Sequence, residues 1–199
     1  MKRIDVIQIG SHMGNTKGDF VYKGVSRGKL NTGILVEPNK KCFALLEKCY
    51  SNYSDFTCLN LAITNTVGII TLYVNNQSDP DWCPNEHSSV HRSHLVGHKH
   101  PEHQIESYDV SCTTLNKLCE NNDIDSVEYL FIDTEGHDSI ILDSIDFGKI
   151  HISNIIFEHT HFDGCFQRGI KYEKSVARLV AIGYKLIESD LSNTWLNKT

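Results

Sequence analysis

The segment 127–138, VEYLFIDTEGHD, restricts the fold more than any other part of this chain. Its apolar run, 127–132, has the length and composition of a strand buried on both faces, as in parallel sheets covered by helices. The run ends in Asp133, Glu135 and His137. Ligands of open α/β sheets bind just beyond the carboxyl ends of such strands. We therefore predict an α/β protein with these ionisable side chains at the mouth of a site.

The rest of the sequence alternates between strand-like and helix-like patterns. A polar stretch at 75–104, rich in histidine and interrupted by three prolines, is typical of an insertion or lid. Because no repeat or linker is evident, we predict a single doubly wound, Rossmann-like domain over 1–199. Its central sheet should be mostly parallel, with a C-terminal antiparallel hairpin. We expect strands at 4–9, 34–36, 56–63, 69–74, 105–112, 127–132, 152–157, 184–187 and 194–196, and helices at 15–27, 40–50, 114–119, 136–142 and 168–182.

Charge and composition argue against several partners. The net charge is −6 and no basic cluster is present, which disfavours nucleic acid. No apolar run reaches the roughly 18–20 residues of a membrane span, and the start lacks the apolar region of a signal peptide. The seven cysteines form no CxxC pair, as expected for reduced thiols. We expect a cytoplasmic protein, or a module of a larger multidomain chain, with neither nucleic acid nor a membrane as partner.

Two features predict a nucleoside-bearing cofactor. Gly10 and Gly14 bracket the turn after the first strand, in the segment IQIGSHMGN, although their spacing is not that of the dinucleotide fingerprint. Glu37 ends the second strand about 20–30 residues later, where a carboxylate binds ribose hydroxyls. A plain strand-to-helix turn and a solvated strand end are the alternatives for each feature taken alone.

These segments resemble the FkbM-type methyltransferase family. IQIGSHMGN is similar to the family's first turn, and GILVEP, at 33–38, to its second strand with the ribose-binding acid. The segment 111–138 is similar to its most specific signature, T-T-L…D-x-E-G-x-E, and IIFEH, at 155–159, to its next strand. Family members often carry two serines where this chain has Ser88-Ser89.

The sequence departs from the family pattern at three positions. Gln8 stands where the family usually has Asp, His12 where it has Asn, and Asp138 where it has the last Glu of the signature. An amide oxygen at Gln8 can still accept a hydrogen bond, but it carries no charge. Family members also often carry more sequence before the first strand.

The resemblance implies the class I methyltransferase fold and S-adenosylmethionine as cofactor. It implies methyl transfer to a hydroxyl oxygen, with a sugar or glycan as the first choice of acceptor. General base chemistry makes Asp133, Glu135 and His159 the candidates for removing the hydroxyl proton. Carried over residue by residue, the cofactor contacts are Gln8, Gly10, Ser11, His12, Gly14, Glu37, Pro38, Asn60, Leu61, Ala62, Ser88 and Asp133.

Structural roles remain open for some of these candidates. If strand alternation continued past the apolar run, the carboxylates of Asp133 and Glu135 would share a face. Glu135 could instead accept hydrogen bonds that hold the turn, and His159 could be an ordinary hydrogen-bonded residue at a strand end.

Other functions also stay open, namely methylation of a non-sugar metabolite, a nicotinamide-dependent oxidoreductase and a histidine-rich metal-binding module. The missing dinucleotide fingerprint counts against the oxidoreductase. His87, His91, His94 and His98 would form one stripe on a helix. Because Gly97 and nearby prolines disfavour a long helix and no firm ligand spacing is present, we assign no metal ligands and interpret 75–104 as a polar lid.

Overall fold

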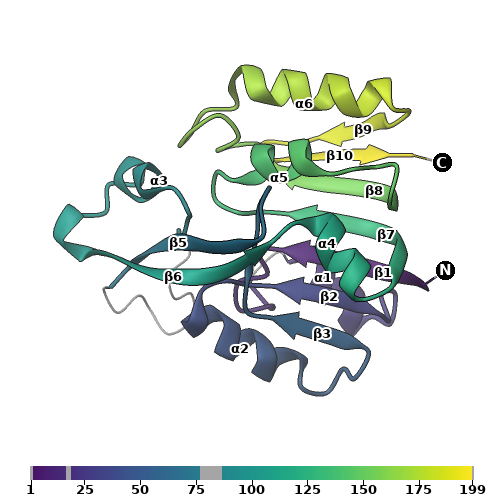
Figure 1. Ribbon diagram of the computed structural model, residues 1–199, viewed down its shortest axis with the longest axis horizontal. Helices are drawn as coiled ribbons and strands as arrows, with labels where there is room; N and C mark the ends of the chain where they lie inside the picture. Colours follow the sequence, from purple (N-terminus) through teal and green to yellow (C-terminus); the bar gives the residue numbers. More distant parts are fainter. Residues whose placement is uncertain (1, 17–18, 77–86, 199) are drawn as a thin grey trace.

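The computed structural model describes residues 2–16, 19–76 and 87–198. Its central sheet has seven strands in the order β3-β2-β1-β7-β8-β10-β9 (Figure 1). Within this sheet β10 runs antiparallel to both of its neighbours, while the other pairings are parallel. The strands are β1 (Lys2–Ile9), β2 (Gly33–Val36), β3 (Phe56–Leu59), β7 (Ile124–Ile132), β8 (His151–Glu158), β9 (Lys185–Ser189) and β10 (Asn193–Asn197).

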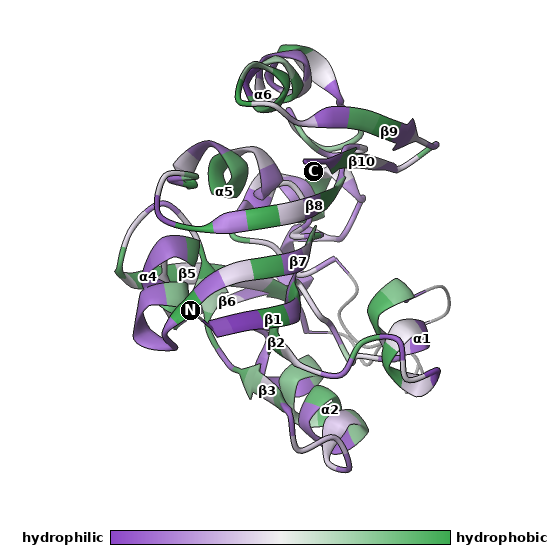
Figure 2. Cartoon of the chain, turned by 90° about the vertical axis from the view of Figure 1, so that its right-hand side faces the viewer, coloured by the Kyte–Doolittle hydropathy of each residue, from purple (hydrophilic) through white to green (hydrophobic). Residues whose placement is uncertain are grey.

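Helices cover both faces of the central sheet (Figure 2). One face packs against α4 (Leu115–Asn121), α5 (Asp138–Ser144) and α6 (Gly169–Ala181), which contribute to the larger apolar core. The other packs against α1 (Phe20–Ser26) and α2 (Lys40–Tyr50) in a smaller core. None of the helices in the described ranges is long and apolar enough to cross a membrane.

A second, three-stranded sheet branches from the first. It contains β4 (Ala62–Ile63), β6 (Ile105–Thr113) and β5 (Gly68–Asn75), in that order. The antiparallel β5–β6 ribbon extends away from the central sheet, and α3 (Arg92–Gly97) lies near its far end (Figure 1). A short 3₁₀ helix, η1 (Glu102–Gln104), leads back into β6. The ribbon therefore carries the histidine-rich insertion.

The doubly wound sheet with its C-terminal antiparallel strands confirms the predicted fold class. Two side chains cap helices: that of Asn39 accepts a hydrogen bond from the N–H of Lys41 at the start of α2, and that of Thr114 accepts from the N–H of Lys117 at the start of α4. Gly183 follows α6 with φ of 102°, as expected for a residue just past a helix end.

The structure corrects several element boundaries. The strand expected at 56–63 is two strands in different sheets, because the chain turns from β3 into β4 at residues 60–61. The helix expected at 136–142 begins only at Asp138, after the left-handed Gly136. The helix expected from residue 15 begins at Phe20, while residues 17–18 lie outside the described part. The insertion at 75–104 contains α3 and η1, and its residues 77–86 are not described.

Gly10 is where β1 and β7 approach most tightly at their carboxyl ends. Its φ is 81°, and a β-carbon placed there would lie 1.7 Å from the carbonyl oxygen of Asp133. The N–H of Asp133 donates to the carbonyl of Ile9 at 3.0 Å, which continues the parallel pairing to this point. Only a residue without a side chain allows the two strand ends to meet in this way.

We predict that Gly10→Ala destabilises the protein far more than an alanine at another left-handed glycine. Gly28 is a matched control, since its φ is 64° and a β-carbon there would have no neighbour within 4 Å. Gly28→Ala should cost roughly 1–2 kcal/mol for the backbone conformation alone. Gly10→Ala adds a backbone clash and should cost more than about 4 kcal/mol. Equal losses in urea denaturation would contradict this account.

Candidate active site

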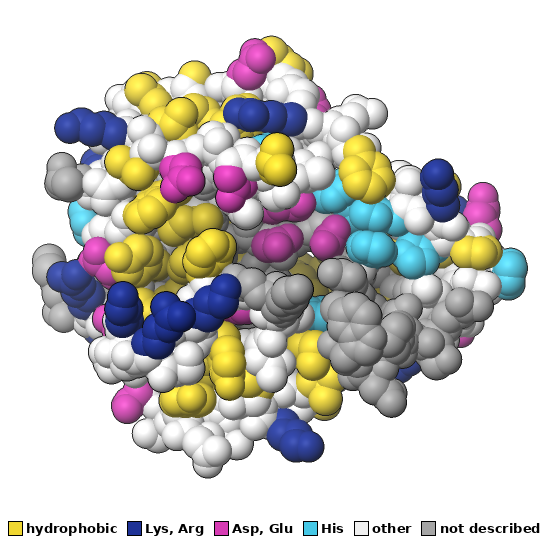
Figure 3. Space-filling view, turned by 180° about the vertical axis from the view of Figure 1, so that it is seen from behind, with side chains coloured by type: hydrophobic (Ala, Val, Ile, Leu, Met, Phe, Trp, Pro, Cys, Tyr) yellow, Lys and Arg dark blue, Asp and Glu magenta, His cyan; other side chains and the backbone are white. Residues whose placement is uncertain are grey.

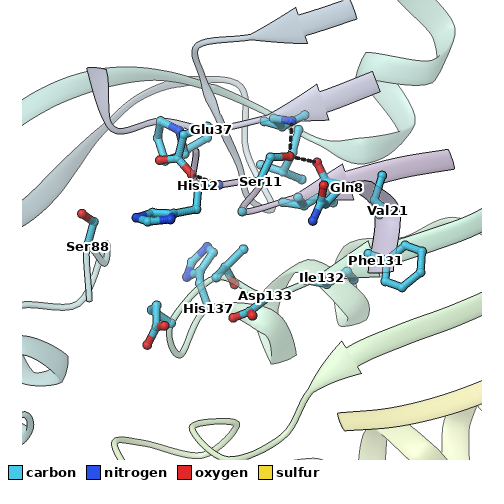
Figure 4. Close-up of a pocket in the computed structure, with 18 of the residues that line it drawn as sticks. Gln8, Ser11, His12, Val21, Glu37, Ser88, Phe131, Ile132, Asp133 and His137 are labelled. Carbon is cyan, nitrogen blue, oxygen red and sulfur yellow. Dashed lines mark hydrogen bonds between the residues drawn. The ribbon is translucent and has the colours of Figure 1, made fainter. Parts of the chain in front are cut away.

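A cavity of about 580 Å³ lies beside the carboxyl ends of β1, β2 and β7. This is the position at which doubly wound sheets bind ligands. Figure 4 shows side chains from these strand ends, and Ser88 from the insertion, arranged around one space. The described lining includes one lysine, Lys23, and the carboxylates of Asp19, Glu37, Asp133 and Glu135. The site is therefore acidic, and Figure 3 shows acidic side chains gathered at a hollow beside histidines.

Ser11 fixes the turn that follows β1. Its hydroxyl donates to the carbonyl of Gln8 and accepts from the N–H of Val36, both at 3.1 Å. The N–H groups of Gly10 and Ser11 each donate to the carbonyl of Val36 at 3.0 Å. The next residue, His12, has φ of 48° and lines the cavity. The ends of β1 and β2 are thus joined into one rigid wall.

Glu37 is buried at the end of β2 with both carboxylate oxygens engaged. Oε2 accepts from the N–H of His12 at 2.8 Å, and Oε1 accepts from the N–H of Asn39 at 2.7 Å. Burial raises the pKa of Glu37 to about 7, although these two hydrogen bonds act in the opposite direction. Each carboxylate oxygen has a second lone pair. Glu37 can therefore accept from two ligand hydroxyls while it holds both turns.

Asp19 joins Gln8 in the cavity wall. One Asp19 oxygen accepts from the N–H of Tyr22 at 2.8 Å and so caps α1, and the other accepts from Nε2 of Gln8 at 3.2 Å. Burial raises the pKa of Asp19. The carboxylate that the family pattern places at position 8 is therefore supplied here by the start of α1. The Oε1 atom of Gln8 is buried without a partner, so it remains an available acceptor.

The turn after β7 gives its two carboxylates different surroundings. β7 ends at Ile132, and Glu135 and Gly136 have φ of 54° and 96°, so the condition for a shared face is not met. Asp133 is exposed and lines the cavity. Glu135 is half-buried, and its Oε2 accepts from Nε2 of His94 at 2.6 Å. Asp133 is thus the carboxylate of this turn best placed to meet a substrate.

His137 is a buried part of the same turn. Its Nε2 lies 2.9 Å from Oγ1 of Thr64 and its Nδ1 lies 3.1 Å from Nε2 of His91. Burial lowers the pKa of His137 to about 4, so the ring is neutral at physiological pH. With both nitrogens engaged, this residue holds the turn that carries Asp133.

The insertion is fastened to the site through two serines. Oγ of Ser88 accepts from Nδ2 of Asn39 at 2.7 Å, at the start of α2. Oγ of Ser89 donates to the carbonyl of Glu135 at 2.8 Å, and the Ser89 backbone pairs with Tyr73 of β5. These contacts connect the ribbon to the walls built by β2 and β7.

The structure brings most of the predicted site residues together. Gly14 instead faces α2, where a β-carbon would lie 2.7 Å from Leu46. Asn60 is exposed, and its amide donates to the carbonyls of Glu37 and Pro38. Within the described residues, the cavity lining omits Gly14, Asn60, Leu61 and His159, and it includes Gln8, Gly10, Ser11, His12, Glu37, Pro38, Ala62, Ser88, Asp133 and Glu135.

His159 occupies a different environment from the one expected for a general base. Its side chain is buried, Nδ1 lies 2.9 Å from Oγ1 of Thr194, and the ring packs against Tyr172 of α6. Burial lowers its pKa. The ordinary structural interpretation of His159 therefore accounts for its contacts.

Several lining residues carried no signal in the sequence. Asp19 could have been recognised as a helix cap, but its place beside Gln8 depends on how α1 packs. The others come from segments that have no motif: Thr16, Phe20, Lys23, Leu72, Val90 and Asn193.

Comparisons with known proteins show which family and which solved structures this chain is similar to. The family model described as the methyltransferase FkbM domain matches residues 8–185. A methyltransferase FkbM from Methylobacillus flagellatus KT aligns with a TM-score of 0.54 and 11% identity, over 98% of this chain and 44% of that one. At this identity the match shows the fold, and the chain spans less than half of that protein's length. No curated protein matches the sequence.

Two further solved structures have lower scores. Fibrillarin from Aeropyrum pernix, with natively bound S-adenosyl-L-methionine, has a TM-score of 0.48 and 6% identity over 97% of this chain and 66% of that one. TrmK from M. capricolum, in complex with S-adenosyl-homocysteine, has a TM-score of 0.42 and 13% identity over 100% of this chain and 63% of that one.

The burial of Glu37 predicts a pH-dependent stability. Because its pKa rises from the ordinary 4.5 to about 7 on folding, the folded state binds more protons than the unfolded state between these values. The stabilisation that comes from this bound proton is fully present below pH 4.5, the pKa of the unfolded state, and is lost as the pH rises through 7. It amounts to roughly 3 kcal/mol.

In urea denaturation, we expect the stability of Glu37→Gln relative to the wild type to increase by about that amount between pH 5 and pH 8. Glu47→Gln, on the exposed face of α2, is the control and should follow the wild type. A Glu37→Gln difference that stays constant with pH would contradict the raised pKa.

Proposed function

Because this chain belongs to the methyltransferase FkbM domain family, we propose that it transfers a methyl group from S-adenosylmethionine to a hydroxyl oxygen of a sugar or glycan. The strand order supports the class I methyltransferase fold. The observation that carries the proposal is the pairing of Glu37, at the end of β2, with Asp133, at the end of β7, in one cavity. Glu37 is suited to bind the cofactor, and Asp133 is suited to act on the acceptor.

The cofactor half of the cavity is built from the ends of β1 and β2. The oxygens of Glu37 suit the vicinal hydroxyls of a ribose, since a carboxylate accepts from both. The glycine turn at Gly10 and Ser11 lets the methionine portion approach the backbone closely. Ala62 and Pro38 give that half an apolar border for the adenine.

The acceptor half is supported by the position of Asp133. The methyl group is already activated on the sulfonium, so the enzyme must place the hydroxyl oxygen in line with it. As the carbon–oxygen bond forms, the carbon–sulfur bond breaks and its electron pair stays on sulfur, giving S-adenosylhomocysteine. The hydroxyl proton passes to the Asp133 carboxylate as general base.

The charge of the cavity favours a neutral acceptor. Among the described residues, four carboxylates line it against one lysine, Lys23, so phosphate or carboxylate groups on the acceptor would be repelled. A neutral, hydroxyl-rich molecule meets no such penalty and can donate to these carboxylates. A sugar or glycan fits this requirement, and a neutral non-sugar alcohol is the second candidate.

We expect the affinity for S-adenosylhomocysteine to increase with pH. The ribose hydroxyls prefer the ionised form of Glu37, and its pKa is about 7 in the free protein. Calorimetric titration should show about tenfold tighter binding at pH 8 than at pH 6. At pH 8, Glu37→Gln should weaken binding by about 10- to 100-fold, the cost of a lost charge-assisted hydrogen bond, and should remove most of the pH dependence.

Glu47→Gln, on the exposed face of α2, serves as the control and should behave as the wild type. If Glu37→Gln bound the cofactor product normally, Glu37 would not be the ribose ligand. Tight binding of a nicotinamide dinucleotide without any binding of S-adenosylhomocysteine would instead support the oxidoreductase alternative.

The acceptor class is tested by a panel of neutral sugars, glycans, sugar phosphates and non-sugar alcohols, with S-adenosylhomocysteine release and product mass as readouts. We expect turnover with neutral sugars or glycans and little with sugar phosphates. In the same assay Asp133→Asn should lower kcat by about 10²–10⁴-fold, because the amide cannot accept the proton, with the affinity for S-adenosylhomocysteine nearly unchanged.

Asp55→Asn, an exposed aspartate just before β3, is the matched control and should keep its turnover. A loss of cofactor binding in Asp133→Asn would reassign that residue to the cofactor. Turnover restricted to non-sugar alcohols would replace the sugar proposal.

A further inference from the structure

Beside the cavity, three histidines and a cysteine converge on one point. Each of His94, His98, His161 and Cys165 offers one ligand atom, and these four atoms all lie within 4.8 Å of one another. Within the described residues, none of the four belongs to the lining of the cavity. Histidine side chains gather next to the acidic hollow in Figure 3, and His94 contacts Glu135 of the cavity lining. The cluster is therefore adjacent to the proposed active site and distinct from it.

Two separate segments build the cluster. His94 lies in α3 and His98 caps its C-terminal end, four residues later, so both side chains project from one face of the helix. His161 and Cys165 lie in the loop that follows β8, again four residues apart. Gly97 makes the approach possible, because a β-carbon there would lie 2.6 Å from Sγ of Cys165.

His94 has the arrangement of an oriented metal ligand. It is 3% exposed, and its Nε2 lies 2.6 Å from Oε2 of Glu135. An ionised carboxylate only accepts hydrogen bonds, so Nε2 carries the proton and Nδ1 keeps its lone pair. That Nδ1 is buried and has no hydrogen-bond partner. A carboxylate on the far nitrogen is the usual partner of a histidine that binds a metal.

His98 and Cys165 complete the firm part of the donor set. The Nε2 atom of His98 is also buried without a hydrogen-bond partner. Cys165 is a free thiol, half-buried at the start of the loop's last turn. Nδ1 of His161 accepts from the N–H of Phe166 at 2.9 Å, so His161 can bind a metal only when this hydrogen bond is released.

The local charge also favours a cation. Glu135 contacts His94, and Oε1 of Glu158 lies 3.8 Å from Nε2 of His161. Burial and the neighbouring acids Asp133, Glu135 and Asp138 raise the pKa of Glu158 to about 9, so the negative charge beside the cluster is that of Glu135.

The alternative is a purely structural role, in which the histidine rings only pack against one another. The ring contacts are real, for His87 stacks on His98 at 3.9 Å between centroids and His94 meets His98 at 4.6 Å. Packing alone, however, leaves two buried ring nitrogens without a partner, and each such unsatisfied atom costs about 1–3 kcal/mol. One ion at the point where the donors converge would give both nitrogens a partner.

We propose that His94, His98 and Cys165, with His161 as the fourth ligand, bind a single divalent transition-metal ion, with zinc as the ion that suits this donor set. Tetrahedral zinc takes nitrogen and thiolate ligands with bonds of about 2.0–2.3 Å, which sets its ligand atoms about 3.3–3.8 Å apart. The four donors need only side-chain adjustments to reach this spacing. On binding, the Cys165 thiol loses its proton to solvent and the thiolate bonds to the metal.

Such an ion would clamp the insertion to the sheet. It would join α3, on the β5–β6 ribbon, to the loop after β8, two segments that are otherwise far apart in the chain. Through His94 it would also fix Glu135 in the turn that carries Asp133. We assign the site a structural role, since four protein ligands leave no open position for a substrate.

The test is metal binding by the purified full chain. Protein freed of metal with a chelator is titrated with Zn²⁺ in competition with a chromophoric chelator, and separately with Co²⁺. We expect one equivalent to bind, and the Co²⁺ form to show a thiolate-to-cobalt charge-transfer band together with the strong visible bands of tetrahedral cobalt. Zn²⁺ should also raise the melting temperature.

Variants identify the ligands. Cys165→Ser should abolish the charge-transfer band, and Cys165→Ser and His98→Ala should each weaken Zn²⁺ binding by at least about 100-fold. The matched controls are Cys58→Ser, on β3, and His103→Ala, an exposed histidine of the same insertion, and both should bind as the wild type does. Circular dichroism confirms that each variant is folded.

Less than about 0.1 equivalent of Zn²⁺ bound by the folded wild type would overturn the proposal. Stoichiometric binding that survives both Cys165→Ser and His98→Ala would overturn it as well, because the ion would then lie elsewhere. Neither outcome depends on the methyltransferase activity, so the two proposals succeed or fail separately.

Discussion

The close approach of Gly10 to the carbonyl of Asp133 is the contact on which the rest of the site depends. It lets β1 and β7 stay paired to their last residues, so that the turns after both strands begin at the same level. One turn presents Ser11 and His12, and the other presents Asp133. A side chain at position 10 would force these turns apart and would separate Ser11 and His12 from Asp133.

A second feature of the structure is the burial of acidic side chains close to one another. Glu37 and Asp138 are buried, and the pKa of each is raised to about 7. Such groups cost folding stability at neutral pH, which is typical of residues retained for binding or catalysis. Hydrogen bonds from backbone N–H groups lower the pKa of Glu37 and so reduce this loss of stability. The hydrogen bond with the side chain of Thr134 does the same for Asp138. The cofactor's hydroxyls and a cation near Glu135 would relieve part of the remainder.

The sequence predicts the parts of the fold that depend on local pattern. The apolar runs that end at Ile9, Val36 and Ile132 are strands, and Glu37 lies in the cavity as expected. Interactions between distant segments could not be seen. Asp19 reaches Gln8 only because α1 packs over β1, and Glu135 turns toward His94 because the chain enters a left-handed turn.

The histidines are the clearest case in which the sequence does not predict contacts between distant segments. Spacing within 87–98 is that of a stripe on one helix, whereas the observed cluster combines two of those histidines with His161 and Cys165 from the loop after β8. His159, which ends a strand at the expected place, turns instead toward Thr194 and α6. A strand end fixes where a backbone stops, but packing decides which face a side chain then takes.

Two structural units surround the cavity, namely the central sheet and the β5–β6 ribbon with its insertion. The cofactor wall belongs to the central sheet, whereas the insertion is mounted on a separate hairpin and touches that wall through Ser88 and Ser89. Changes in the insertion that spare Ser88, Ser89, His91 and His94 leave its contacts with the turns at the strand ends in place. In the proposed enzyme, the insertion is therefore the part of the site that can change with the acceptor, while the strand ends that would hold the methyl donor stay the same.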